Sequence, residues 1–273
     1  MFHHVFQLPI EQRIKDTLAQ APVLHHDETG VRRAGALAWA HVTSTSRLTH
    51  YAIHRKRGRE ALEAIGILHD FEGVSVHDGW APYRSHTQCR HALCNVHHLR
   101  ELTFLEEQYQ QTWAAEMKTL LREMKAATNH ARTRGGVCLP PAERMDFLAR
   151  YHTLLATGLA ANPSPTGERR AGQRGRVAQS HVRNLLERLL LQQDQVLAFL
   201  NDLSIPFDNN EAARDLRGLK IQQKVSGCFR SDWGADAYAT IRGYLATVRK
   251  QGQSLFAALS SVFTGRPLYP LSA

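Results

Sequence analysis

The stretch that decides the fold is GVSVHDG, at residues 73–79. Its valines alternate with polar residues, as in a half-buried strand, and the expected strand ends at Asp78, where Gly79 stops it. The stretch VLHHD at residues 23–27 has the same plan, a short apolar run that leads to Asp27. Because ligands gather at strand ends in α/β sheets, two strands that each end in an acid predict a sheet with a ligand site at its edge.

A hairpin is expected directly after the first of these strands. Residues 37–43 and 48–53 are rich in β-branched, aromatic and apolar side chains, and the residues between them are polar. This alternation of apolar runs with a short polar link is typical of two antiparallel strands. Gly30 and Gly35 bracket an expected turn before the hairpin.

Helical spacing of apolar residues dominates the chain from Leu99 to Leu200. Outside that region we expect two shorter helices and one more short strand, at residues 1–20, 59–68 and 91–96. Two Gly/Pro-containing breaks interrupt the helical region, at residues 133–141 and 162–177. Strands followed by helices predict an α/β or α+β fold.

The bulk composition bounds the class of protein. The 273 residues carry a net charge of +9 and a pI near 9.7, which suits a polyanionic partner such as nucleic acid and equally an ordinary basic protein. The sequence lacks the apolar run of about 18 residues that a membrane span needs, and it has no signal-peptide pattern. Four scattered cysteines indicate a reducing compartment. We therefore expect a cytoplasmic protein.

Asp27 and Asp78 are the strongest candidates for chemistry. Two carboxylates that meet at a sheet edge could hold Mg²⁺, a hard ion that prefers oxygen ligands. A pair of such ions about 4 Å apart can activate a hydroxyl and stabilise the leaving oxygen of a phosphodiester. The plain alternative is that both acids belong to turns, which favour aspartate.

Several short blocks in a fixed order carry a resemblance to a known family: HDET at residues 26–29, HDGW at 77–80, CNVH at 94–97 and DNN at 208–210, with KVSGCFR at 224–230 and IRGY at 241–244. Together they resemble the bacterial insertion-sequence transposases of the TnpC type, the IS-sixty-six family, over residues 22–265. The resemblance implies a ribonuclease-H-like fold in which two Asp and one Glu bind Mg²⁺ (or Mn²⁺). It also implies cleavage and joining of DNA strands at transposon ends. Asp27 and Asp78 match the first two acids.

The third acid departs from the family pattern. The family block reads D-N-N-x-A-E-R, whereas residues 208–214 read DNNEAAR, so that Ala213 stands at the position of the family glutamate. Glu211 is the nearest glutamate and is our candidate third catalytic acid. The expected buried stripe of this helix is Ala212, Leu216 and Leu219, and Glu211 and Ala213 flank it on opposite sides, about 200° apart. Glu211 could equally be a first-turn acid that complements the helix dipole.

The amino end is a second departure. Family members carry a long DNA-binding region before the catalytic domain, whereas here only about one helix precedes Asp27. Both departures together suggest a rival interpretation, a truncated and catalytically inactive copy that acts at most in DNA binding or subunit interaction. A third interpretation is a nuclease that hydrolyses DNA without joining strands.

A row of basic residues follows the third block: Arg214, Arg217, Lys220 and Lys224. Residues three or four apart are neighbours on a helix surface, so the row could follow a phosphate backbone. A solvated helix face is the alternative. A second basic group in the loop, Arg169, Arg170, Arg174 and Arg176, could also contact DNA.

Cysteine and histidine cluster around residues 89–98. Zinc favours such ligands, but the spacing fits no standard zinc module well. We interpret Cys94 and His97 as possible structural residues, with His97 near the metal site or DNA as an option. His25 and His26 adjoin Asp27 and could position a phosphate, or serve as ordinary strand histidines.

The sequence thus predicts a mixed α/β sheet of ribonuclease-H-like type, with flanking helices and a helical insertion before the third acidic position. The expected organisation is an N-terminal helix, a strand-rich core, a helical insertion, C-terminal helices that complete the core and a tail, at residues 1–21, 22–98, 99–200, 201–265 and 266–273. The expected partners are DNA, as transposon ends and target, and further copies of this chain when it is active.

Overall fold

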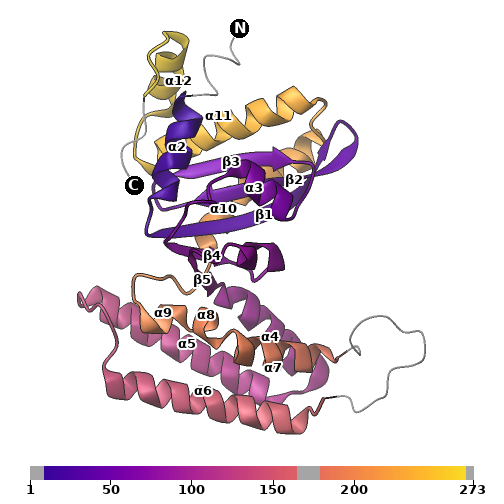
Figure 1. Ribbon diagram of the computed structural model, residues 1–273, viewed down its shortest axis with the longest axis vertical. Coiled ribbons are helices and arrows are strands. Elements are labelled where there is room, and N and C mark those ends of the chain that lie inside the picture. Colours follow the sequence, from indigo (N-terminus) through magenta and orange to yellow (C-terminus); the bar gives the residue numbers. More distant parts are fainter. Residues whose placement is uncertain (1–8, 165–178, 269–273) are drawn as a thin grey trace. The chain divides into compact units, whose positions relative to one another are not determined.

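A computed structural model describes residues 9–164 and 179–268 of the chain. It contains two compact units. The α/β unit comprises residues 1–91 and 209–273, and the helical unit comprises residues 92–208. Figure 1 gives the labels of their helices and strands.

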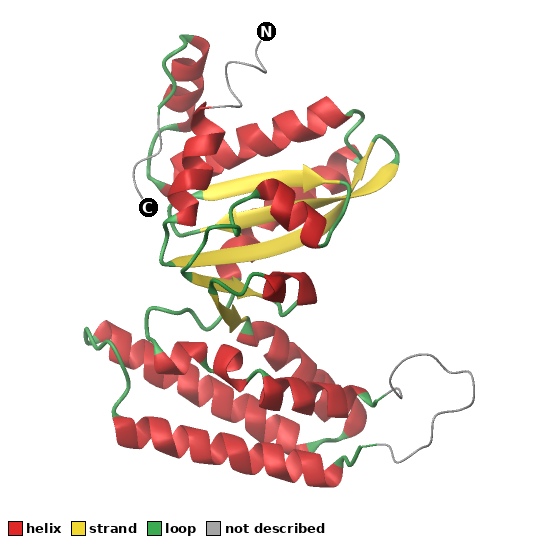
Figure 2. Ribbon diagram, viewed as in Figure 1, coloured by secondary structure: helices red, strands yellow, loops and turns green. Residues whose placement is uncertain are grey.

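Five strands form the sheet of the protein (Figure 2). They are β1 (Val23–Arg33), β2 (Ala36–Ser44), β3 (Thr49–His54), β4 (Val74–His77) and β5 (Arg90–Leu93), in the spatial order β3-β2-β1-β4-β5. The β1–β2 and β2–β3 pairs are antiparallel, whereas β1 and β4 are parallel. The sheet is therefore mixed, as the sequence predicted.

The β2–β3 hairpin is confirmed, but the turn before it lies later than predicted. β1 continues through Gly30, which pairs with Trp39, and the chain turns at Ala34 and Gly35. Both turn residues have positive φ angles, 48° and 80°, and glycine adopts such angles without strain. The strand continues because Val31, which is buried, pairs with Ala38 in the antiparallel ladder.

Helices pack on both faces of the sheet in the α/β unit. Their bounds are α2 (Pro9–Ala19), α3 (Arg59–Ile65), η1 (Ala81–Ser85), α10 (Asn210–Ser226), α11 (Asp232–Lys250) and α12 (Leu255–Phe263). One core joins α2 and α3 to residues such as Leu24. The other joins α10 and α11 to Val31 and Val42. Since side chains alternate between the two faces of a strand, residues of β1 with odd numbers point toward α10.

The stripe predicted for α10 is confirmed, because Ala212, Leu216 and Leu219 are all buried in that second core. Helix α10 begins directly after Asn209. Asn209 occupies the N-cap position, but its side chain makes no capping hydrogen bond. It contacts strand β1 instead, as described below.

The helical unit contains α4 (Asn95–Tyr109), α5 (Thr112–Thr133), α6 (Pro141–Ala161), α7 (His181–Leu191), α8 (Gln193–Val196) and α9 (Ala198–Asn201). The predicted insertion, residues 99–200, lies within this unit. The break predicted at residues 133–141 is confirmed. The helical stretch expected between the second break and Leu200 is present, and it is divided at Gln192 and Leu197 into α7, α8 and α9. Val196 to Leu200 are all buried, and five consecutive residues cannot share one face of a continuous helix.

The arginines predicted in the second basic group, at residues 169–176, lie outside the described residues. Over the described helices, none combines the length and apolarity that a membrane crossing requires.

Candidate active site

Asp27 lies in the middle of β1 and not at its end. It is the fifth of eleven residues in the strand, and it pairs with Val42 of β2. The expectation of a strand end is therefore wrong for this acid, because the antiparallel ladder with β2 continues past it. Its Oδ1 accepts a hydrogen bond of 2.9 Å from the backbone N–H of Glu28.

Asp78 follows the last residue of β4 directly, as the sequence predicted. Its Oδ1 accepts a hydrogen bond of 2.9 Å from the backbone N–H of Trp80. Gly79 between them has a φ of 92°, a left-handed value that favours glycine. The tight turn fixes the Asp78 side chain at the end of the strand.

The strand register brings the two acids side by side. β1 and β4 are parallel and pair Val23 with Val74 through His25 with Val76. The same offset, continued by two residues, sets Asp78 beside Asp27. Adjacent strands lie about 4.8 Å apart, and side chains in register point to the same face. Both carboxylates therefore belong to the α10 face of the sheet.

The electrostatics of Asp27 agree with this placement. Its pKa is raised from 3.8 to about 6, chiefly by burial and then by the negative charges of Glu28 and Asp78. Lys220 of α10 opposes the shift. Within the described chain, neither Asp27 nor Asp78 forms an ion pair with a basic side chain. The site therefore carries negative charge that lacks a direct counterion.

Helix α10 is fixed against β1 by side-chain contacts along its length. At its start, Asn209 Oδ1 lies 2.9 Å from His25 Nδ1, and Asn209 Nδ2 donates to the carbonyl of His26 at 2.7 Å. Further along, Gln223 Nε2 donates to the carbonyl of Gly30 at 3.1 Å. These contacts place the helix lengthwise beside the strand that carries Asp27.

Ala213 lies on the side of α10 that these contacts define. At about 100° per residue, Ala213 shares one stripe with Asn209, four residues before it, and with Lys220, seven residues after it. Asn209 contacts β1, and Lys220 acts electrostatically on Asp27. A methyl group therefore stands on the stripe from which a longer side chain would reach the acidic pair.

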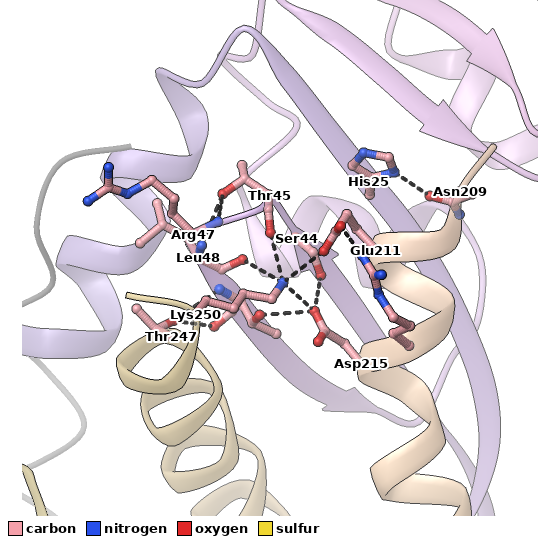
Figure 3. Close-up of polar contacts among 12 residues, drawn as sticks. His25, Ser44, Thr45, Arg47, Leu48, Asn209, Glu211, Asp215, Thr247 and Lys250 are labelled. Carbon is pink, nitrogen blue, oxygen red and sulfur yellow. Dashed lines mark hydrogen bonds and ion pairs between the residues drawn. The ribbon is translucent and has the colours of Figure 1, made fainter. Parts of the chain in front are cut away.

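Glu211 lies on the other side of the helix, in a separate polar network (Figure 3). It pairs with Arg214, and its Oε2 lies 3.7 Å from Nζ of Lys250. Asp215, one turn further, accepts from Ser44 Oγ at 2.6 Å and from Lys250 Nζ at 2.8 Å. These are the observed partners of Glu211, and its role as a third catalytic acid stays a prediction.

The four basic residues predicted to contact DNA are all exposed: Arg214, Arg217, Lys220 and Lys224. The helix divides them into two groups. Arg217, Lys220 and Lys224 project on the Ala213 side, each within about 40° of Ala213 and within about 60° of one another. Arg214 points away and pairs with Glu211. Three of the four positive charges therefore flank the side that faces the acids.

His25 and His26 are both buried. His25 contacts Asn209, and His26 Nδ1 lies 3.2 Å from Thr43 Oγ1. Burial, assisted by neighbouring histidines, lowers the pKa of His26 well below its ordinary value. Of the two alternatives, these contacts favour ordinary strand histidines.

Cys94 and His97 lie at the start of α4 in the helical unit. Cys94 is buried, and its carbonyl accepts from the backbone N–H of His97 at 3.1 Å. Among residues 9–164 and 179–268, no cluster of three or more His, Cys, Asp or Glu side chains is arranged to hold a metal ion. A zinc site therefore gains no support, and the structural role of this pair stays a prediction.

Two groups of interacting residues could not be found from the sequence. The first is Asp215 with Lys250, which no motif marks. The second surrounds Glu28, which pairs with Arg57 at 2.8 Å and accepts from the Tyr83 hydroxyl at 2.6 Å. The only available signal for the second group was that Glu28 adjoins Asp27 within the HDET block.

The protein is thus a mixed α/β domain in which two acids lie side by side. The helix that follows the third sequence block, α10, packs on the same face of the sheet. The family model described as Transposase IS66 family matches residues 3–237, and the chain belongs to that family. The resemblance that the sequence blocks indicated is confirmed. No curated protein and no solved structure matches the chain.

Proposed function

We propose that this chain is the catalytic domain of a DNA transposase, with a ribonuclease-H-like fold of DDE type. It would cleave phosphodiester bonds and transfer strands at the ends of an insertion sequence, with Mg²⁺ or Mn²⁺. The observation that carries the proposal is the β1–β4 register, which when continued by two residues sets Asp27 beside Asp78 on one face, without a basic partner among the described residues.

The donor set fits a hard divalent cation. Carboxylate oxygens are the ligands that Mg²⁺ prefers, and this ion is commonly held by one or two carboxylates together with water and substrate phosphates. Asp27 and Asp78 would hold it, and its charge would favour the ionised form of Asp27, which burial and then the neighbouring acids disfavour. When bound, the ion supplies charge stabilisation for a phosphoryl centre and activation of a water or hydroxyl.

The other residues of this face suit a DNA substrate. Arg217, Lys220 and Lys224 project together on the exposed side of α10 next to the acids. Such a row can neutralise phosphates and fix the register of a DNA strand without reading its sequence. Association of several copies of the chain on transposon ends belongs to the same proposal.

Ala213 favours a second candidate function, that of a DNA-binding or subunit-interaction protein with the same fold and no cleavage. The methyl group stands on the stripe of α10 that contacts β1, while Glu211 is paired with Arg214 and Lys250 on the other side. Under this alternative the basic face remains and the chemistry is lost.

A direct experiment compares the native chain with Ala213→Glu, using labelled transposon-end DNA and Mg²⁺ or Mn²⁺. A third carboxylate that strengthens charge stabilisation by about 3–4 kcal/mol raises the cleavage rate by about 10²–10³-fold. Asp78→Ala, in each background, controls for contaminating nucleases. Cleavage by the native chain that disappears in Asp78→Ala supports a working enzyme.

Cleavage by Ala213→Glu alone supports the second candidate for the native chain and the same fold for both. If neither protein cleaves, the experiment counts against the proposed chemistry. DNA affinity measured over a range of salt concentrations then tests what remains of the second candidate, because phosphate contacts weaken as salt rises.

A further inference from the structure

Behind the acidic pair, on the opposite face of β1, lies a buried glutamate. Glu28 follows Asp27 directly, and only 2% of its side chain is exposed. Its Oε1 accepts from Arg57 twice, from Nε at 3.0 Å and from Nη2 at 2.8 Å. Its Oε2 accepts from the Tyr83 hydroxyl at 2.6 Å. Both oxygens of this carboxylate therefore have fixed partners.

Arg57 is itself held between two aromatic rings. Its guanidinium carbon lies 4.7 Å from the ring centre of Trp39 and 4.1 Å from that of Trp80. A planar cation over aromatic faces is attracted by both rings. Trp39 belongs to β2, and Trp80 belongs to the turn after β4. One side chain thus connects three separate segments of the α/β unit.

Two of these three segments are tied to the two acids. Trp80 donates its backbone N–H to Asp78 Oδ1, and its ring packs on Arg57. Glu28 donates its backbone N–H to Asp27 Oδ1, and its carboxylate binds Arg57. A movement of Arg57 would therefore reach both Asp27 and Asp78.

We propose that Arg57 is a positioning residue that sets Asp27 and Asp78 at the spacing at which they hold a divalent cation. The inference rests on the proposed function, because it takes these two acids as the cation ligands. Arg57 itself touches neither the ligands nor the substrate. It acts through Glu28 on one strand and through Trp80 on the other.

An arginine suits this role better than any other cation. Its planar fork donates two hydrogen bonds to Glu28 while its guanidinium lies over two indole rings. A lysine would keep the positive charge beside Glu28 but would lose the fork and the stacked geometry. The comparison of Lys with Arg at this position therefore separates positioning from simple charge compensation.

The experiment measures Mn²⁺ binding to the full chain by electron paramagnetic resonance, without DNA. Loss of groups that orient metal ligands typically weakens metal binding by about 10–100-fold. We expect Arg57→Gln to weaken Mn²⁺ binding about tenfold, and Arg57→Lys to lie closer to Arg57→Gln than to the native chain. At equal total Mn²⁺, the sharp signal of free Mn²⁺ should be stronger in both variants than in the native chain.

Arg55→Gln is the matched control. It removes the same charge two residues earlier, from a side chain that is 74% exposed and pairs with Asp232. Its Mn²⁺ affinity should equal that of the native chain. Arg57→Gln leaves the carboxylate of Glu28 buried without its cation, which could unfold the protein. The double variant Glu28→Gln with Arg57→Gln removes both charges and is therefore tested beside it. Circular dichroism of each variant confirms that the fold is retained.

Native-like Mn²⁺ binding by Arg57→Lys would overturn the inference, because the role would then be charge compensation alone. Native-like binding by the folded double variant would also overturn it. Failure of the proposed function has a different signature, namely a native chain whose Mn²⁺ binding does not depend on Asp78. In that case the inference falls with it.

Discussion

Two pairs of acids lie in the α/β unit, and their surroundings are opposite. Glu211 and Asp215 are surrounded by partners, among them Arg214, Lys250 and the hydroxyl of Ser44. Asp27 and Asp78 accept backbone hydrogen bonds and have no basic partner within the described part of the chain. The difference teaches that the partners of a carboxylate, and not its position in a motif, decide whether it is available to a metal ion.

The two pairs also differ in what they contribute to the fold. Asp215 has its negative charge compensated inside the unit by Lys250, whose Nζ donates in addition to the carbonyl of Thr45 at 2.7 Å. Asp27 is partly buried next to other acids, and its raised pKa means that the fold disfavours its charged form. One pair therefore stabilises the structure, whereas the other costs stability, as expected of the metal site proposed above.

The largest effect should come from breaking the compensated pair. Asp215→Ala leaves Lys250 mostly buried without its nearest carboxylate, so the free energy of unfolding should fall by about 3 kcal/mol. Urea denaturation followed by circular dichroism measures the change. Ser44→Ala removes only one neutral donor to the same carboxylate and should cost about 1 kcal/mol. A loss below that of Ser44→Ala would contradict the central role of Asp215.

A smaller effect of opposite sign should follow from neutralising Asp27. Its pKa is higher in the folded state than the ordinary 3.8, so the folded state binds the proton more tightly, and stability falls as the pH rises from about 4 to about 6. Asp27→Asn keeps the acceptor for the Glu28 N–H and removes the charge. We expect it to raise the free energy of unfolding by about 2 kcal/mol at pH 8.

The same substitution should have almost no effect at pH 3.5, where Asp27 is protonated in the native chain. Denaturation curves at the two pH values, without divalent cations, give the comparison. Equal stabilisation at both pH values would show that the charge on Asp27 is not the cause. Excess Mg²⁺ should reduce the difference at pH 8, because a cation bound by the native chain stabilises only the folded state.

The smallest effect is expected at Glu211. Its contacts are an i,i+3 pair with the exposed Arg214 and a longer approach to Lys250, and such surface pairs contribute less than about 1 kcal/mol. Glu211→Gln should therefore leave both the stability and the Mn²⁺ affinity nearly unchanged. A large loss of Mn²⁺ binding in this variant alone would make Glu211 a ligand and end the contrast between the two pairs.

The sequence was sufficient for the parts of the site that depend on local pattern. The strands that carry Asp27 and Asp78, the hairpin after β1 and the buried stripe of α10 all follow from alternation or helical spacing. The extent of β1 was misjudged, because Gly30 signals a turn locally while its pairing with Trp39 keeps it in the strand. Tertiary pairing overrode the local signal.

The supporting contacts could not be predicted, because they join residues far apart in the chain. Glu28 and Arg57 are 29 residues apart, and Asp215 and Lys250 are 35 apart. Neither pair has a spacing that belongs to a helix or a turn. These charges are brought together only by the tertiary fold, through the register of the sheet and the packing of α10 and α11 against it.

The side chain of Asn209 forms hydrogen bonds with residues of β1 and does not cap its own helix. As a consequence, α10 cannot rotate about its own axis relative to β1 without loss of these hydrogen bonds. A turn of about 200° to exchange Ala213 for Glu211 would break two buried hydrogen bonds, and each buried group left without a partner costs about 1–3 kcal/mol. It would also expose Ala212, Leu216 and Leu219. We therefore expect a third carboxylate on this stripe to come from a substitution such as Ala213→Glu, and not from rotation of the helix.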